Sequence, residues 1–205
     1  MKESSLEKFA PLTGVLSAVL LMAGAGIFGV YEYLPSGDKL QGIFNQNPTR
    51  VTIAGYIGTL SAFFLMWFAA SLYKTLRQRE DNAGRLSMLA FGGGTASGIA
   101  LAIGFSALIA SGARAGAEGG ISSVEALTLY DLYGQVLGQM FAVTMAVFIA
   151  ASGVVSLRIR LTRAWFGWVS VVVAIGLLTP IAYIVLALVL VWLIGVSIWL
   201  YLRPA

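Results

Sequence analysis

The chain contains no cysteine and no histidine among its 205 residues. The absence of cysteine excludes disulfides, thiolate metal sites, Fe–S clusters and cysteine nucleophiles. The absence of histidine excludes histidine-ligated haem, histidine–zinc sites and histidine-based acid–base catalysis. Together the two absences exclude most metalloenzymes, cytochromes and triad hydrolases, and we expect neither a metal nor a cofactor.

Charged residues are also scarce. They make up 11% of the chain, against about 25% in ordinary soluble domains. Hydrophobic residues make up 59%, and the mean hydropathy is +0.87. A soluble protein of this size needs more polar residues to face water, whereas a lipid bilayer removes that requirement. The composition therefore predicts an integral membrane protein.

Apolar runs of membrane-spanning length fill most of the sequence. A helical span takes about 20 apolar residues. We predict an all-α transmembrane bundle forming one domain over residues 1–205, with about six spans at 11–31, 51–73, 86–111, 128–157, 164–178 and 181–202. The first run has a longer apolar core than a cleaved signal peptide, so we interpret it as a retained span.

The final apolar stretch, residues 164–202, is about two spans long. It contains Thr179–Pro180, where a helix is expected to end or kink. Splitting it there gives a short fifth span and a full sixth span. The alternative is one kinked or re-entrant segment, which would place the C-terminus on the other side of the membrane.

The basic residues indicate the orientation of the chain. With the N-terminus inside, the inner loops hold 10 basic residues and the outer loops hold 3. Inner loops are typically the ones rich in Lys and Arg, so both termini are predicted to be cytoplasmic. The net charge of +4 is thus explained by topology, and we expect no nucleic-acid partner. The ten inner residues are Lys2, Lys8, Lys74, Arg77, Arg79, Arg85, Arg158, Arg160, Arg163 and Arg203.

The outer loops carry local helix signals. In Pro35–Pro48, Leu40, Ile43 and Phe44 have helical spacing and indicate a short amphipathic helix on the outer surface. Asn47 and Pro48 suit the N-cap and first position of the second span. In the next outer loop, Ser122 and Glu125 form a capping-box pattern before the fourth span.

Two spans carry small residues at intervals of four. Small residues let membrane helices approach closely. We interpret the stripes as the contact between spans three and four, with a homodimer or partner interface as the alternative. The residues concerned are Gly94 and Gly98, with Ala90 and Ala102, in span three, and Gly134, Gly138 and Ala142, with Ala146 and Ala150, in span four.

Asp131, Gln135 and Gln139 form a polar stripe with the same spacing. Counting back from Arg158 places Asp131 about 10 Å outside the hydrocarbon, Gln135 near its boundary and Gln139 just inside. Tyr56 and Thr59, with Thr52, form a polar face at a similar height on span two. One interpretation is a small ligand-binding pocket open to the outside. The other is ordinary hydrogen bonding between helices.

Catalytic groups are hard to find. The apolar runs 86–108, 132–157 and 164–202 contain no acidic or basic side chain, and Glu32 and Asp131 both lie at outer ends. Membrane pumps and ion-coupled transporters usually keep such a group near the midplane. An enzyme would need a carboxylate pair such as Glu32 with Asp131, so we expect a protein that is not an enzyme.

The layout resembles that of small bacterial integral membrane proteins with six predicted spans and no assigned function. The features that carry the resemblance are "LQGIFNQNPTRVTIAGYIG" after span one, "SLYKTLR" at the exit from span two, and "LTRAWFGWVSVVVAIGLL" (Leu161–Leu178) leading into span five. The resemblance implies six spans and a bacterial plasma membrane. It brings no catalytic residues.

Two functions follow as hypotheses. The first is a non-enzymatic membrane component or complex subunit that acts through helix packing, with membrane lipids, further copies of itself or other membrane subunits as partners. The second is a binder or transporter of a small neutral or lipophilic molecule through the outer polar pocket. An intramembrane enzyme is a third and weaker hypothesis.

Overall fold

The computed structural model describes residues 9–30, 35–80, 84–158, 164–179 and 182–202. Every regular element in these residues is a helix, as the composition predicts. Five helical stretches are long and apolar enough to cross a membrane, and α8 is shorter. The elements are η1 (Ala10–Leu12), α2 (Thr13–Phe28), α3 (Gly37–Gln46), α4 (Pro48–Arg79), α5 (Arg85–Ala115), α6 (Ser123–Gln135), η2 (Val136–Phe141), α7 (Ala142–Arg158), α8 (Ala164–Leu177) and α9 (Ala182–Leu202).

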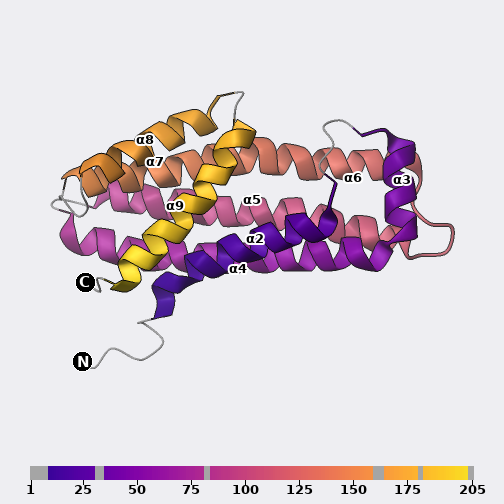
Figure 1. Ribbon diagram of the computed structural model, residues 1–205, viewed down its shortest axis with the longest axis horizontal. Helices are drawn as coiled ribbons and strands as arrows, with labels where there is room; N and C mark the ends of the chain where they lie inside the picture. The colour runs from indigo at the N-terminus through magenta and orange to yellow at the C-terminus, as the bar shows by residue number, and fades with distance from the viewer. Residues whose placement is uncertain (1–8, 31–34, 81–83, 159–163, 180–181, 203–205) are drawn as a thin grey trace.

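Three long rods form the body of the bundle. The helices α4 and α5 and the continuous run α6–η2–α7 lie along the long axis, with α5 packed between the other two (Figure 1). On one face α2 packs along α4, while α8 follows α7 and α9 runs obliquely back across the bundle. The short helix α3 crosses one end. The rods exceed the predicted spans because their charged end turns extend the helices beyond the apolar core.

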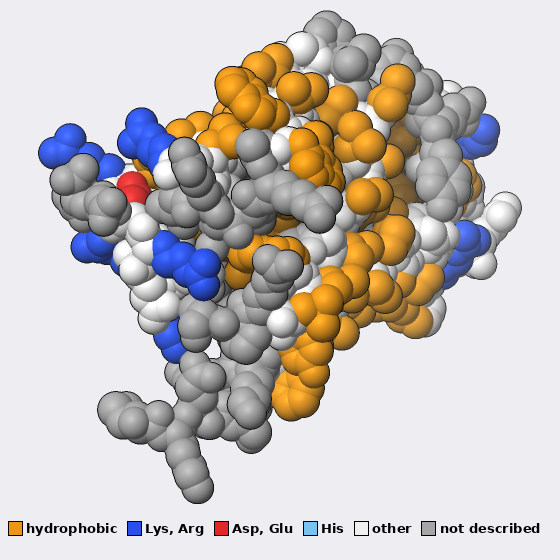
Figure 2. Space-filling view, turned by 60° about the vertical axis from the view of Figure 1, so that its left-hand side comes forward, with side chains coloured by type: hydrophobic (Ala, Val, Ile, Leu, Met, Phe, Trp, Pro, Cys, Tyr) orange, Lys and Arg blue, Asp and Glu red, His pale blue; other side chains and the backbone are white. Residues whose placement is uncertain are grey.

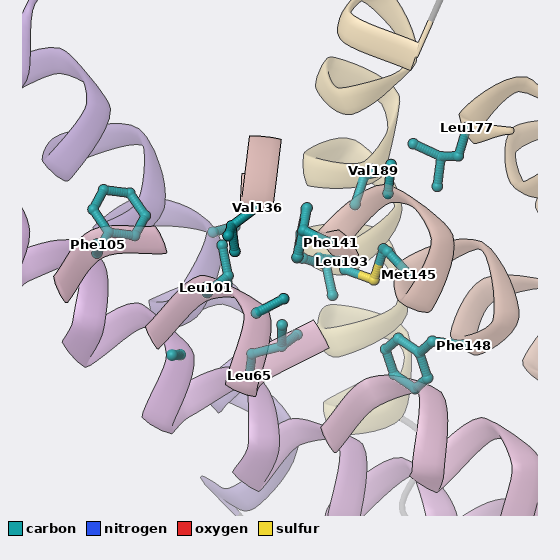
Figure 3. Close-up of a cluster of buried hydrophobic side chains, with 14 of the residues drawn as sticks. Leu65, Leu101, Phe105, Val136, Phe141, Met145, Phe148, Leu177, Val189 and Leu193 are labelled. Carbon is teal, nitrogen blue, oxygen red and sulfur yellow. The ribbon is translucent and has the colours of Figure 1, made fainter. Parts of the chain in front are cut away.

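A single apolar core joins these layers. Figure 3 shows Leu65 of α4 and Leu101 of α5 facing the same cluster as Met145 and Phe148 of α7 and Leu193 of α9. All five side chains are buried. The core therefore runs across the bundle, and α9 is packed into it rather than lying apart.

The two ends of the bundle differ in charge. The end where α4 stops, α5 starts and α7 stops carries five basic residues and one carboxylate, counted over the residues that the structure describes. We call it the basic end; Figure 2 shows Lys and Arg gathered there. The opposite end, called the α3 end, carries three basic and four acidic residues on the same count. The five basic residues of the basic end are Lys74, Arg77, Arg79, Arg85 and Arg158.

At the α3 end, the predicted amphipathic helix is confirmed. Its apolar residues Leu40 and Phe44 are fully buried against the bundle. Asn45 holds the helix in place, because its amide donates to the Ile121 carbonyl (3.2 Å) and its Oδ1 accepts from the Ile121 N–H (2.9 Å). The helix thus closes the end of the bundle.

Local cap signals were largely correct. Ser122 and Glu125 form the predicted capping box at the start of α6. Pro48 is the first residue of α4, although Asn47 makes no side-chain cap bond there. The role of Arg50 was not predicted from the sequence: its Nε donates to the Ile27 carbonyl near the end of α2 (2.5 Å). Such a bond satisfies one of the carbonyls that a helix end leaves without an intrahelical partner.

The break predicted at Thr179–Pro180 is present, since α8 ends at Leu177 and α9 begins at Ala182. Close approach of Gly153 to Ser170 fixes how α8 lies antiparallel on α7. Seven residues from Ser170 to Leu177 rise only about 10 Å, so the turn lies near the middle of the bundle (Figure 1).

From that turn α9 returns to the basic end. There the Tyr201 ring stacks on that of Phe9, with the ring centres 6.2 Å apart. The first and last described turns of the chain therefore lie side by side. A single kinked segment that carries the C-terminus to the opposite end is not what the structure shows.

Candidate functional site

The predicted polar stripe lies on the outside of the bundle. Asp131, Gln135 and Gln139 are all exposed. Between Val136 and Phe141 the helix widens into the π-helical turn η2, which contains Gln139. Wide turns of this kind are rare and occur frequently at functional sites. The sequence predicted a regular helix here.

Contacts with α5 show how deep Gln139 lies. The Ser97 hydroxyl of α5 donates to Thr144 Oγ1 of α7 (3.1 Å). Seven residues after Ser97 in α5, a Cβ atom added to Gly104 would lie 3.2 Å from the side chain of Leu137. Gln139 lies between Leu137 and Thr144 in the sequence. It is therefore at the same height in the bundle as the part of α5 between Ser97 and Gly104.

That level is close to the middle of the bundle. The helix α5 runs from Arg85 to Arg114 between its charged ends, so its midpoint lies near Ile99. Gln139 is thus deeper than counting along the fourth span alone suggests. An exposed amide at this depth would face hydrocarbon, where an unpartnered polar group is costly.

Tyr56 and Thr59 do not join this stripe. The Tyr56 side chain is 61% exposed, and the Thr59 hydroxyl donates to Gly55 O of its own helix (2.9 Å). The helix α5 lies between α4 and the α6–η2–α7 run (Figure 1). The two groups of residues, on α4 and on the α6–η2 run, therefore do not line one pocket together. Ligand binding by them stays a prediction.

The small residues of span three make close contacts, chiefly with α4. A Cβ atom on Gly94 would lie 2.6 Å from that of Ala69, and one on Gly98 would overlap Met66. The contact with α7 is made by the neighbouring Gly93, where a Cβ atom would lie 2.7 Å from the Phe148 nitrogen. The stripe thus marks a close approach chiefly to α4, while Gly94 also lies near the Phe148 ring of α7, the helix that was predicted as its partner.

The small residues of span four divide into two groups. Ala142 is buried inside the bundle, while Gly138 is half-buried. Gly134 faces open space, since an added Cβ would have no neighbour within 4 Å. The end of the stripe nearest the α3 end therefore lies on the same exposed surface as Gln135.

Buried side-chain hydrogen bonds made by serine hydroxyls join the helices, and they were not predicted from the sequence. The Ser17 hydroxyl donates to Ser61 O (3.0 Å) and the Ser61 hydroxyl to Ser17 O (2.9 Å), which links α2 to α4. The Trp192 indole donates to the Ser170 hydroxyl (2.8 Å), which links α9 to α8. Serines within apolar spans were the available signal.

An apolar groove lies between the start of α2 and α4. Its volume is about 430 Å³. It lies between the Ser17–Ser61 pair and the basic end, and it was not predicted from the sequence. It is lined by Phe9, Ala10, Leu12, Thr13, Val15, Leu16, Phe64 and Trp67.

Acidic clusters do not offer a metal site among the described residues. No group of three or more Asp or Glu side chains there could hold a metal ion. Glu32 lies outside the described residues, so the structure does not place the carboxylate pair that an enzyme would need.

Comparisons with known proteins give no relative. No family model matches the chain, and neither a curated protein nor a solved structure matches it. The function is therefore inferred from the residues and their geometry.

Proposed function

We propose that this chain is a non-enzymatic component of a membrane assembly, which contacts a second copy or another membrane subunit through the face that carries Asp131, Gln135 and Gln139. The observation behind the proposal is the exposure of Gln139 at mid-height of the bundle. A primary amide carries both a donor and an acceptor, so a neighbouring helix with a similar side chain satisfies it.

The surroundings of the stripe suit a helix contact. Gly134 offers a place where another backbone can approach closely, because no side chain occupies it. Leu132 and Met140 are exposed beside it and supply apolar contact area. Interhelical hydrogen bonds in membranes contribute about 0.6–2 kcal/mol each, so two amides and close packing together would stabilise a contact.

The proposal includes an orientation and a membrane. The excess of basic residues at the basic end supports placing that end in the cytoplasm, with both termini there. The α8–α9 hairpin then enters from the cytoplasmic side and turns inside the bilayer. A bacterial plasma membrane rests on the resemblance in layout alone.

Cross-linking of single cysteines tests the contact, because the natural chain has none. We expect Gln135→Cys or Gln139→Cys, each labelled with a thiol-reactive photo-cross-linker, to form a cross-linked product in isolated membranes on illumination. The product would have twice the mass of the chain, or the combined mass of the chain and its partner subunit. Ile99→Cys is the matched control, since it is also exposed and near mid-height but on α5.

The proposal fails if the Gln135 and Gln139 variants stay monomeric while the attached photo-cross-linker is shown to react. It also fails if all three variants cross-link equally, which would indicate random collision. A purified protein that is strictly monomeric in mild detergent, with no partner, would contradict it independently.

A further inference from the structure

The apolar groove beside Trp67 has the size of a binding site. Its volume of about 430 Å³ falls within the roughly 300–1,000 Å³ that is usual for small-molecule sites. The side chains of Phe9, Leu16 and Trp67 at its margins are about half exposed, so it opens sideways. An opening on the flank of a membrane bundle faces the acyl chains of lipids.

Charge lies directly beyond the groove. Lys74 is exposed and follows Trp67 by seven residues of α4, which is two helical turns along the same face and about 10 Å. Arg77 continues the basic end one turn further on. A lipid whose chain occupied the groove would hold its phosphate near this level.

The headgroup must decide which lipid occupies such a groove. A chain already in hydrocarbon gains no hydrophobic free energy when it moves from lipid to protein. Preference among lipids with similar chains therefore depends on fit and on charge. The basic end carries five basic residues and one carboxylate, Glu80, among the described residues, so its net charge is positive.

We propose that the groove binds one acyl chain of an anionic phospholipid, with the phosphate held at the basic end beside Lys74. This site is separate from the Gln135–Gln139 face, so it does not depend on the proposed function. Its ligand is a structural lipid of the leaflet at the basic end.

Trp67 provides the readout, because bromine on an acyl chain quenches a contacting indole. The protein is placed in phosphatidylcholine vesicles that contain a fixed fraction of phosphatidylglycerol, with one lipid or the other brominated. Subtracting the fluorescence of the Trp67→Phe variant leaves the fluorescence of Trp67 alone. We expect brominated phosphatidylglycerol to quench Trp67 more than its share of the lipid, and high salt to reduce this preference.

Two variants with matched controls sharpen the test. Lys74→Gln should lower the preference about fivefold, while Arg114→Gln at the α3 end should leave it unchanged. Ala10→Phe fills the groove and should abolish quenching above the lipid average, whereas Ala110→Phe on an exposed face of α5 should not.

Quenching by each brominated lipid in proportion to its share of the bilayer would overturn the proposal, because the site would not select charge. Quenching by neither lipid would also overturn it, since the groove would then be covered by protein, whether a second copy or another segment of the chain. A Lys74→Gln variant with unchanged preference would contradict the placement of the phosphate.

Discussion

Gly58 and Gly92 are both helical glycines in apolar spans, yet their surroundings are opposite. A Cβ atom on Gly58 would overlap the buried ring of Phe105, whereas one on Gly92 would meet nothing within 4 Å. Gly58→Ala should therefore lower the free energy of unfolding by about 1–3 kcal/mol through overpacking. Gly92→Ala should raise it by roughly 0.5–1 kcal/mol, because alanine favours a helix over glycine.

Titration from mild detergent into SDS, followed by circular dichroism, measures both changes. The two substitutions add the same methyl group, so each is the control for the other. A gain of stability for Gly58→Ala similar to that for Gly92→Ala would show that the contact between α4 and α5 at Gly58 is looser than the structure indicates.

Residue patterns of this kind were only partly predictable. The four-residue interval of Gly94 and Gly98 indicates that a helix approaches closely, and one does. The pattern cannot identify which helix, because a stripe has no partner until the bundle is assembled. The Ser17–Ser61 bonds were missed for the same reason, since each serine finds its partner 44 residues away.

At the scale of the element, Glu80 ties the end of α4 to the start of α5. Its carboxylate accepts from the Leu86 N–H (3.2 Å), from the Ser87 N–H (2.9 Å) and from the Ser87 hydroxyl. Partial burial, the largest single influence, raises the Glu80 pKa. The bonds from Ser87 and Leu86 and the charge of Arg77 together outweigh it and bring the pKa below its usual 4.5.

The lowered pKa determines the sign of a pH effect. A carboxyl whose pKa is lower in the folded state contributes stability above its unfolded pKa, and this is lost as pH falls through the folded value. The stability difference between the natural chain and Glu80→Gln should thus stay constant from pH 7 to about pH 5 and shrink below about pH 4.5. Thermal melting in detergent at several pH values measures it.

Ser87→Ala is the companion variant. Removing the hydroxyl bond should raise the Glu80 pKa towards its unfolded value, so the pH-dependent loss of stability should be smaller and complete at a higher pH than in the natural chain. A difference between the natural chain and Glu80→Gln that stayed flat down to pH 3 would contradict the role given to this carboxylate.

The closing helix α3 is clamped by the side chain of Asn45 in addition to its buried apolar residues. Asn45→Asp keeps the Oδ1 acceptor but loses the amide donor to the Ile121 carbonyl. We expect faster hydrogen exchange at the Ile121 amide and in α3, because a weaker clamp lets the helix detach more often. Exchange measured by mass spectrometry reports this. Gln46→Glu, on the same helix and also exposed, is the control and should leave exchange at Ile121 unchanged.

Elements were predictable where their signals are local. The pairing of Ser122 with Glu125, the position of Pro48 and the break at Thr179–Pro180 are all set by neighbours in the chain, and all were correct. The wide turn η2 was not predictable, because one residue too many in a helical turn leaves no mark in composition or spacing. It changes how Gln139 is presented, so the candidate site was the least predictable part of the fold.

At the scale of the whole molecule, the short α8 limits how the chain can cross the membrane. Its 14 residues span about 21 Å, less than the roughly 30 Å of a hydrocarbon core. The turn after α8 satisfies its own backbone: the Leu178 and Thr179 N–H groups donate to Ile175 O and Gly176 O. The Thr179 hydroxyl also donates to Gly176 O (2.6 Å). These bonds satisfy polar groups at the end of α8, which suits a position inside the bilayer.

Single cysteines in the cysteine-free chain test this topology with a membrane-impermeant maleimide. On intact cells we expect labelling at Asn47→Cys on the α3 end, and protection at Gln78→Cys and Leu202→Cys on the basic end until the membrane is opened. Leu178→Cys, exposed on the bundle but at mid-height, should stay unlabelled in both conditions. Labelling of Leu178→Cys from outside would mean that α8 and α9 cross as two complete spans. Protection at Asn47 with labelling at Gln78 would reverse the orientation that the basic residues predict, because the charge excess would then face outward.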